Sequence, residues 1–394
     1  MIHRMPIQII CIFLCIWVVF TSNVILYQKN IGRPYISARN STRFHGNSTP
    51  EAPRKYSLDS DMCMLPYISS QSSKMKAPTP SHFFNVLLVS RSCHEIVQYL
   101  TQEELKGTPQ NHNETVHMSG SAVIGSDGDA MQCHDNKVIP SLGCQTSRGM
   151  VPSCDETLPT FSTVIIISQF WGEGYFHFFI EGMPRLMDVD PRVYSEEVVH
   201  VHTNIIHMSI ASQMLRLISS NLKPISGSVR AENSIIPPST PCGGHRYSKR
   251  HMPFLRLSLQ NKLTVKQPKH ALLVRRHGSR AIANHEELLR EISLLFPVIV
   301  HEGSESILDQ LQIFSDAYLV IAPHGAGLSN IVAMQAGGSV IEILPNHMNA
   351  CYGLLAFNLG LCYAPYYDPE FTQNNAVIVN VSYLAEMAKT VVIR

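Results

Sequence analysis

The chain has 394 residues, a formal net charge of +1 and only 15% charged residues. This length allows two domains beyond any targeting segment. The balanced charge argues against a nucleic-acid partner, for which a basic stripe is expected. The 19 histidines are scattered without the paired helical spacing and third ligand of a zinc site, so we expect no metal site.

The first element is an uncharged apolar stretch over residues 7–26. About 20 such residues suffice to span a membrane. The stretch exceeds a usual signal-peptide core, and no clear cleavage site follows it, which favours a signal anchor over the alternative of a cleaved signal peptide. We therefore expect a cytoplasmic tail at 1–6, a transmembrane anchor at 7–26 and a luminal remainder. The predicted location is the Golgi or endoplasmic reticulum membrane, as a single-pass type II protein.

Residues 27–80 are polar and rich in proline, which predicts a stem without a packed core. Asn-x-Ser/Thr sequons support a luminal location. They begin at Asn40, Asn47, Asn113 and Asn380. Eight cysteines outside the apolar span are compatible with up to four disulfides, whose connectivity the sequence does not reveal. They are Cys63, Cys93, Cys133, Cys144, Cys154, Cys242, Cys351 and Cys362.

An N-terminal domain is expected over residues 81–255. Folded sequence begins near 83–89, and residues 105–160 are rich in loops and contain three cysteines. The patterns that follow predict alternating strands and helices. They are strands at 161–168 and 197–202 and helices at 174–187 and 209–221.

A boundary is expected within the proline-rich segment 223–268, and a C-terminal domain over 256–394. Short apolar runs and helical patterns alternate regularly from His270 onward. The expected strands are 270–275, 298–300, 318–322 and 340–344, and the expected helices are 284–295, 304–314 and 383–393. This alternation predicts a parallel, doubly wound sheet.

The predicted helix 174–187 places His177, Glu181 and Arg185 on one face, at positions i, i+4 and i+8. A histidine beside a carboxylate can serve as a tuned general base. The alternative is an ion pair on a helix surface. Pro184 is expected to kink or end this helix.

A basic loop, Arg275–Arg280, directly follows the strand at 270–275, at the edge where open α/β sheets bind ligands. Arg276 and Arg280 could clamp a diphosphate, because guanidinium donors match phosphate oxygens. The alternative is a basic loop that pairs with Glu286 and Glu287. Asn284 is expected to cap the following helix.

The apolar run 317–323 is followed by a turn containing Gly325 and Gly327 and then by helical spacing. Backbone N–H groups at such a helix start can bind phosphate. Glu342 lies near the carboxyl end of the next strand, where α/β sheets bind nucleotide hydroxyls. The alternative is a tight turn without a ligand. Arginines and glycine turn meet at one sheet edge, which suits a nucleotide diphosphate without a Walker loop or an obligatory metal.

Three motifs in this order resemble glycosyltransferase family 61, over residues 170 to 345. They are His177-Phe-Phe-Ile-Glu181 with Pro184-Arg185-Leu186, Arg276-x3-Arg280-x3-Asn284-x-Glu286, and His324-Gly-Ala-Gly-Leu-x-Asn330 with Val340-Ile-Glu-Ile-Leu-Pro345. The resemblance implies an α/β fold of GT-B type, with two Rossmann-like domains and the donor in the C-terminal one. It also implies inverting transfer from a nucleotide sugar, typically a UDP-sugar, to a glycan or glycoprotein.

The resemblance also implies roles for individual residues. Glu181 would be the base, with His177 beside it, and Arg185 is an acceptor-site candidate. Glu342 would hold the ribose or orient the glycine turn. The implied donor-binding residues are Arg276, Arg280, Asn284, Glu286, His324, Gly325, Ala326, Gly327, Leu328, Asn330 and Glu342. We expect no tightly bound cofactor and no required divalent metal.

The sequence departs from the family pattern at two places. The family often has Asp where Glu181 stands, and the run Ala281–Ala283 is less charged. An inactive GT-B module that binds glycans or acts as a scaffold is therefore the alternative function. A secreted phosphate-binding hydrolase fits less well, because the sequence has neither a nucleophile elbow nor a metal cluster.

Overall fold

The computed structural model describes residues 114–141, 151–154, 157–169, 171–204, 207–238, 251–264, 266–344, 351–367 and 375–392. The predicted anchor, the stem, the expected start of folded sequence at 83–89 and the sequons at Asn40, Asn47 and Asn113 lie outside these residues. Within them, no helix has the length and apolar character needed to cross a membrane.

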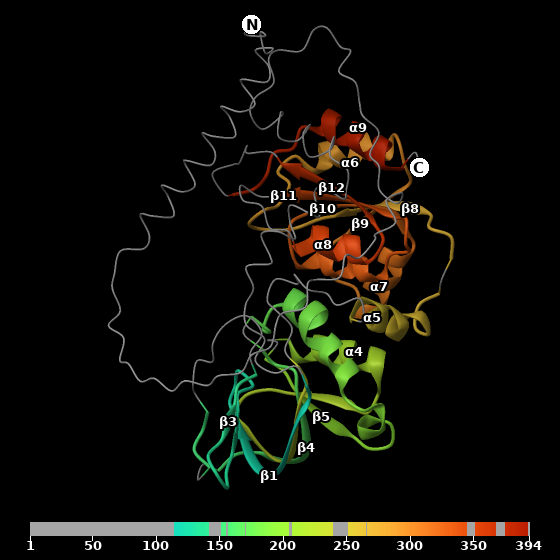
Figure 1. The fold of residues 1–394 in the computed structure, drawn as a ribbon. Coiled ribbons are helices and arrows are strands. Elements are labelled where there is room, and N and C mark those ends of the chain that lie inside the picture. Colours follow the sequence, from blue (N-terminus) through green and yellow to red (C-terminus); the bar gives the residue numbers. More distant parts are fainter. Residues whose placement is uncertain are drawn as a thin grey trace, which may run out of the picture. The chain divides into compact units, whose positions relative to one another are not determined.

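The described residues form two β-sheets, and helices pack beside each of them, as expected for an α/β protein (Figure 1). The first sheet has seven strands in the order β3-β2-β1-β7-β4-β5-β6. The strands are β1 (Val116–Ile124), β2 (Ala130–Gln132), β3 (Val138–Ile139), β4 (Thr160–Ile166), β5 (Val199–His202), β6 (Leu222–Ile225) and β7 (Val229–Ile236). Pairing is parallel from β7 through β4 and β5 to β6, and antiparallel at the β3-β2-β1-β7 side. The sheet is therefore mixed and only partly Rossmann-like.

Strand β1 corrects the expectation that residues 105–160 are mainly loops. The strand pairs with the full length of β7, but its register shifts between Ser119 and Ala122. Gly120 lies at this irregularity with a φ of 91°. Because the bulge interrupts the period-two alternation of side chains, the sequence pattern does not reveal the strand. A disulfide joins Cys133 to Cys154.

The helical elements before the second sheet are η1 (His177–Gly182), η2 (Met183–Asp188), η3 (Pro191–Tyr194), α4 (Met208–Ile218) and α5 (His251–Gln260). The predicted helix 174–187 is present, but it winds as a π-helix in η1 and as a 3₁₀-helix in η2. Pro184 lies in the first turn of η2, as its missing N–H allows. The segment 223–268, expected to hold a domain boundary, contains most of β6 together with β7 and α5, and the position of the boundary stays a prediction.

The second sheet has five parallel strands in the order β12-β11-β10-β8-β9. The strands are β8 (His270–Val274), β9 (Val298–His301), β10 (Ala317–Pro323), β11 (Ser339–Leu344) and β12 (Cys362–Tyr367). Every residue of β8 and β11 is buried, which is why these strands are apolar apart from His270, Ser339 and Glu342. The strand order reverses between β8 and β10, the kind of position where doubly wound sheets bind ligands.

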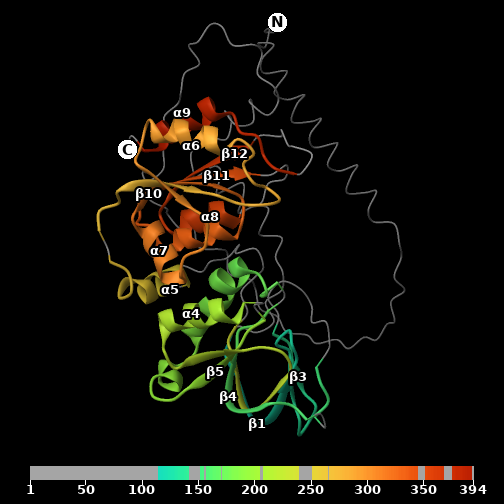
Figure 2. The same ribbon diagram turned by 180° about the vertical axis from the view of Figure 1, so that it is seen from behind.

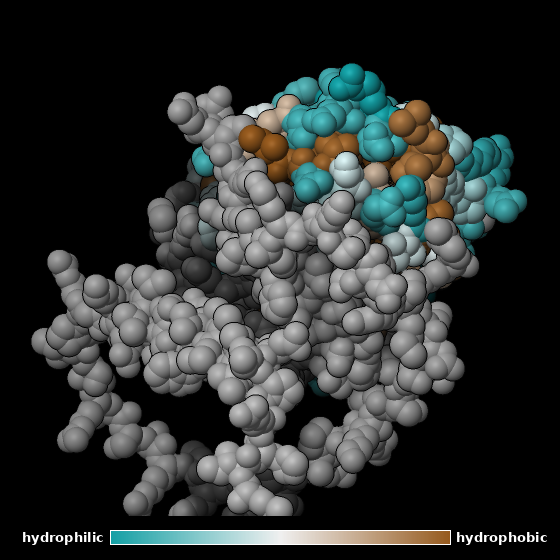
Figure 3. Space-filling view, turned by 90° about the horizontal axis from the view of Figure 1, so that it is seen from above, coloured by the Kyte–Doolittle hydropathy of each residue, from teal (hydrophilic) through white to brown (hydrophobic). Residues whose placement is uncertain are grey.

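Helices cover both faces of this second sheet, α6 and α9 on one and α7 and α8 on the other (Figures 1 and 2). The helices are α6 (His285–Ser293), α7 (Ile307–Ser315), η5 (Ala326–Ala333), α8 (Cys351–Asn358) and α9 (Val381–Val392). Leu272 and Val320 face the layer that contains α7 and α8, whereas Leu273 and Ile321 face α6 and α9. The sequence patterns did not predict α8 or β12. Seen from above, the surface has hydrophilic areas interspersed with smaller apolar ones (Figure 3).

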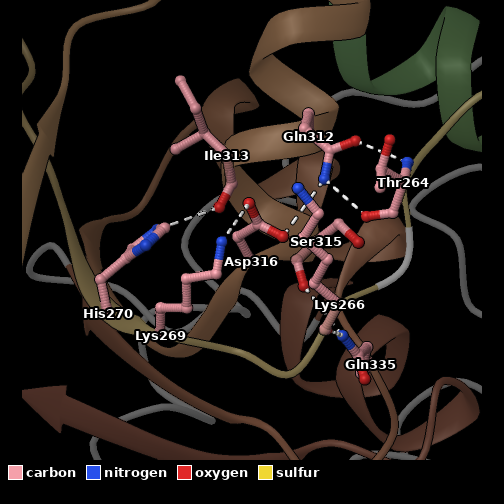
Figure 4. Close-up of polar contacts among 9 residues, drawn as sticks. All are labelled: Thr264, Lys266, Lys269, His270, Gln312, Ile313, Ser315, Asp316 and Gln335. Atoms are coloured by element: carbon pink, nitrogen blue, oxygen red, sulfur yellow. Dashed lines mark hydrogen bonds and ion pairs between the residues drawn. The ribbon is translucent and has the colours of Figure 1, made fainter.

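The segment before β8 is tied to the C-terminal half of α7 by polar contacts (Figure 4). The side chain of Gln312 accepts a hydrogen bond from Thr264 N at 2.8 Å and donates to Thr264 O at 3.0 Å. His270 Nε2 lies 3.1 Å from Ile313 O. These contacts hold the start of β8, and the segment before it, against α7.

Candidate active site

A pocket of about 310 Å³ opens at the switch point of the parallel sheet. Its lining comes from the loops after β8, β9 and β10, from α7 and η5, and from Tyr175 and Ile210, which precede the second sheet in the sequence. Among the residues that line it are Tyr175, Arg275, Arg276, Glu302, Gln310, Gly325, Ala326, Gly327 and Asn330. The pocket therefore lies at the sheet edge where the sequence predicted a ligand.

The glycine turn after β10 brings two loops into direct contact. Gly325 has an extended backbone, with φ 164° and ψ 171°. A Cβ atom on Gly325 would lie 2.0 Å from Nη1 of Arg276. The same Nη1 donates to His324 O at 3.4 Å. A side chain at this position would therefore displace the end of the flexible Arg276 side chain.

The helix that follows the turn, η5, is a 3₁₀-helix instead of the expected α-helix. Hydrogen bonds between residues three apart close its ends, from Leu328 N to Gly325 O and from Met334 N to Ile331 O, both at 3.0 Å. Leu328 itself is buried in the apolar core and faces away from the pocket lining. Ala326 and Gly327 are in the pocket lining.

Neighbouring arginines after β8 have different partners. Arg275 is bound by Glu286, by Glu302 at 3.2 Å and by His285 Nδ1 at 3.0 Å. The ion pair that the sequence left open for this loop is thus made by Arg275. Arg276 donates from Nε to Ser279 O at 2.7 Å. Successive side chains of an extended segment point in opposite directions, which explains the division.

Arg276 lines the pocket, and Arg280 lies near enough for its charge to act on Arg276 but is not itself a lining residue. Burial, and then the charge of Arg280, lowers the pKa of Arg276. Within the described residues, no carboxylate lies at ion-pair distance from either guanidinium. Arg280 has a φ of 64°, and its N–H donates to Asn375 O at 2.9 Å. Two neighbouring cations without a carboxylate partner favour binding of an anion.

Glu342 lies beneath the glycine turn and is fully buried. Its Oε1 is hydrogen-bonded to His324 Nδ1, and its Oε2 accepts a hydrogen bond from the hydroxyl of Tyr363. Glu342 is also absent from the pocket lining. Of the two roles implied for it, the geometry supports orientation of the turn.

Asn330 connects three elements beside the pocket. Its Oδ1 accepts a hydrogen bond from the Tyr175 hydroxyl at 2.6 Å, and its Nδ2 donates to Gln310 Oε1 at 3.2 Å. Tyr175 directly precedes the π-helical segment that contains His177. Asn330 is therefore a link between this segment and α7, at the edge of the pocket.

Asn284 and Glu286 are placed by contacts at the start of α6. Asn284 occupies the N-cap position, but its side chain makes no capping hydrogen bond. Its amide instead bridges the backbone of Val379, with distances of 2.9 Å and 3.0 Å. Glu286 is exposed and paired with Arg275. Direct contacts of Asn284 and Glu286 with a donor stay predictions.

The His177–Glu181 pair predicted from the sequence is formed. His177 Nδ1 lies 2.7 Å from Glu181 Oε2, which also accepts a hydrogen bond from Gln169 Nε2 at 2.7 Å. The side chain of His177 is 26% exposed and that of Glu181 is 1% exposed. Both stand in the π-helical turn η1, and such turns are frequent at functional sites.

Arg185 is fully buried in η2. Its guanidinium donates to the carbonyl oxygens of Pro237 at 2.8 Å, Pro238 at 3.1 Å and Ser168 at 3.2 Å. Burial lowers its pKa to about 9. Arg185 thus ties three backbone segments together, and direct contact with an acceptor stays a prediction.

Aromatic contacts connect the π-helical turn to the glycine turn. Phe176 packs edge-on against Tyr352 of α8, with ring centroids 5.2 Å apart. Tyr352 packs in the same way against His324, at 5.3 Å. Burial, followed by the charges of Glu342 and Glu181, raises the pKa of Cys351. Edge-on ring contacts thus run from Phe176, beside His177, through Tyr352 to His324 of the glycine turn.

Sequence reasoning missed four residues at this site: Gln169, Tyr175, Glu302 and Gln310. Gln169 and Glu302 follow predicted strands, and Tyr175 and Gln310 lie within predicted helices. Among the described residues, no group of three or more His, Cys, Asp or Glu side chains could hold a metal. That no divalent ion is required stays a prediction.

Comparison with known proteins agrees with the three motifs. Residues 175–341 match the family model described as Glycosyltransferase 61, which confirms the resemblance. No curated protein matches the chain. Among solved structures, the chain is similar to a dodecameric iron-containing heptosyltransferase, TibC, in complex with ADP-D-beta-D-heptose. Identity is 8%, the TM-score is 0.29, and the match covers 68% of this chain and 80% of that one.

Proposed function

Because residues 175–341 form a glycosyltransferase 61 domain, we propose that this protein is an inverting glycosyltransferase. It transfers a sugar from a nucleotide sugar, with UDP as the expected nucleotide, to a hydroxyl of a glycan or glycoprotein. The proposed fold is of GT-B type, with the donor bound at the five-stranded sheet. The observation that carries this proposal is Arg276 in the pocket lining against the glycine turn, with the charge of Arg280 near it, at the switch point of that sheet.

The donor diphosphate lies against Arg276, Arg280 and the backbone of the turn at Gly325. As the bond from the anomeric carbon to the diphosphate oxygen breaks, negative charge develops on the leaving phosphate. The two guanidinium groups stabilise this charge, which is the role that a divalent ion has in other enzymes. The guanidinium of Arg276 is held for this purpose by Ser279 O and His324 O.

The acceptor hydroxyl loses its proton to the His177–Glu181 pair as the new glycosidic bond forms on the opposite face of the sugar. The exposure of His177 supports its Nε2 atom as the group that meets the hydroxyl. Glu181, held by Gln169, then accepts the Nδ1 hydrogen bond and orients the ring. Direct proton transfer to Glu181 is the other form of the same proposal.

The test is a thermal-shift and calorimetric screen of the purified full-length protein against UDP, GDP and CMP. A ligand that binds only the folded form raises the melting temperature. We expect one nucleotide to stabilise the protein, and Arg276→Ala or Arg280→Ala to remove the effect. Arg192→Ala is the matched control, since its arginine is exposed and pairs only locally with Asp190. Binding without any transfer to glycans would instead support an inactive glycan-binding or scaffold module.

We also propose that the protein is a type II membrane protein of the Golgi or endoplasmic reticulum with a luminal site. The apolar stretch 7–26 and the sequons support this. The Cys133–Cys154 disulfide fits an oxidising compartment, and Asn380 is exposed at the start of α9. Protection from protease in sealed microsomes, together with a mobility shift on removal of N-glycans, is the expected result. Digestion of the whole chain in sealed microsomes would contradict it.

A further inference from the structure

Glu302 brings a carboxylate into the pocket from the loop after β9. It directly follows His301, the last residue of that strand, and its side chain is 45% exposed. Among the described residues that line the pocket, Glu302 is the only one with a carboxylate. It therefore supplies a hydrogen-bond acceptor in a region otherwise marked by cationic side chains.

The position of Glu302 in the sheet matches that of the ribose-binding acid in dinucleotide-binding βαβ units. Strand β8, helix α6 and strand β9 form one βαβ unit, with β8 and β9 parallel neighbours. In dinucleotide-binding units of this kind, the first strand-to-helix turn meets phosphate and an acidic residue further along binds ribose hydroxyls. Arg276 and Arg280 occupy the first position here, and Glu302 occupies the second.

Glu342, for which the family resemblance implied either the ribose or orientation of the glycine turn, is not available for this contact. Both of its oxygens are engaged, by His324 and Tyr363, and the side chain is fully buried. The ribose of a nucleotide therefore needs another acceptor on this sheet edge.

Arg275 holds Glu302 in place. Arg275 Nη1 donates to Glu302 Oε1 at 3.2 Å, while Nη2 contacts Glu286 and His285. One oxygen of the Glu302 carboxylate is thus fixed against the end of β8. The carboxylate is held at the pocket without neutralising Arg276.

We propose that Glu302 accepts hydrogen bonds from the ribose hydroxyls of the donor nucleotide. The proposal rests on the nucleotide-sugar function proposed above and adds the residue that separates a ribonucleotide from bare diphosphate. Hydroxyls that donate to a charged carboxylate give stronger hydrogen bonds than neutral pairs. Glu302 is therefore a specificity-determining residue for the nucleoside, distinct from the arginines that bind the phosphates.

The experiment is calorimetry of the full-length protein with UDP, 2′,3′-dideoxy-UDP and pyrophosphate, and with GDP and its dideoxy form. We expect wild-type protein to bind the ribonucleotide about 10-fold or more tightly than the dideoxy form. In Glu302→Gln this difference is lost, and pyrophosphate binds as before. Glu291→Gln is the matched control, because Glu291 lies on α6 of the same βαβ unit but outside the pocket lining.

Unchanged preference for the ribonucleotide in Glu302→Gln would overturn the inference while leaving the proposed function standing. An equal loss in Glu291→Gln would also overturn it, since the effect would then not be specific to Glu302. If wild-type protein binds neither UDP, GDP nor pyrophosphate, the donor site is absent and both proposals fail.

Discussion

The guanidinium of Arg276 lies where a side chain on Gly325 would begin, with 2.0 Å between Nη1 and the position of a Cβ atom. The residues come from loops after two different strands, β8 and β10. Their contact joins these two loops at the switch point of the sheet. It also holds Arg276, one of the two cations that we assign to the diphosphate.

Gly325→Ala is expected to displace Arg276 and to weaken UDP binding by about 10-fold or more, as loss of a hydrogen bond to a charged group does. Backbone strain is not the cause, because Gly325 has an extended conformation that alanine can adopt. The affinity for UDP, measured by calorimetry, tests this. Unaltered affinity in the variant would contradict it.

A double variant separates this effect from general damage to the turn. If Gly325→Ala acts by displacing Arg276, then Gly325→Ala combined with Arg276→Ala binds UDP no more weakly than Arg276→Ala alone. Strictly additive losses would show that the two residues act independently.

His177→Ala is expected to lower kcat by about 10² to 10⁴, the usual contribution of a general base. Affinity for UDP should change little, because His177 is not in the pocket lining. Steady-state kinetics with donor and acceptor, together with calorimetry for UDP, test both statements.

Glu181→Gln distinguishes the two forms of the proton-transfer proposal. If His177 accepts the proton, the variant keeps a group that can orient the ring, and it retains more activity than His177→Ala. If Glu181 accepts the proton itself, the order of the two variants is reversed. Full kcat in both variants would refute a role for the pair.

Tyr175→Phe is expected to reduce the free energy of unfolding by about 1–3 kcal/mol, because Asn330 Oδ1 is buried and loses its donor. Chemical denaturation measures this. Tyr318→Phe is the matched control, since Tyr318 is half-buried and its hydroxyl has no recorded partner in the described part of the chain. An equal effect in both variants would speak against the Asn330 link.

Because of His202, we expect the free energy of unfolding to fall at acidic pH. Burial lowers the pKa of His202 to about 4, from 6.5. Its ring lies 2.7 Å from Ser168 Oγ through Nδ1 and 2.8 Å from Gly227 O through Nε2, as suits a neutral imidazole. The unfolded chain binds a proton more readily, so stability is present above pH 6.5 and is lost as the pH falls towards 4.

The expected loss from His202 is about 3 kcal/mol in the free energy of unfolding. Denaturation midpoints between pH 7.5 and 4.5 measure it. His202→Gln should reduce this loss, because glutamine does not titrate. The same loss at acidic pH in the variant would assign the effect to other groups.

Much of the C-terminal sheet could be predicted from the chain alone. Strands such as β8 and β10 are buried on both faces, so their residues form apolar runs that end at arginines or at a glycine turn. Likewise, the spacing of His177 and Glu181 sufficed to pair them, since residues four apart meet on a helix. Strand β1 escaped prediction because a bulge at Gly120 breaks its alternation.

Only the tertiary structure decided which charged groups neutralise one another. Arg275 and Arg276 are adjacent in sequence, yet one is bound by two carboxylates and the other faces Gly325. Glu302 and Glu342 both lie at or near the carboxyl ends of strands, yet one lines the pocket and the other is fully buried. Local patterns specify strands and turns, whereas the partners of a side chain depend on loops that the sheet order brings together from distant parts of the chain.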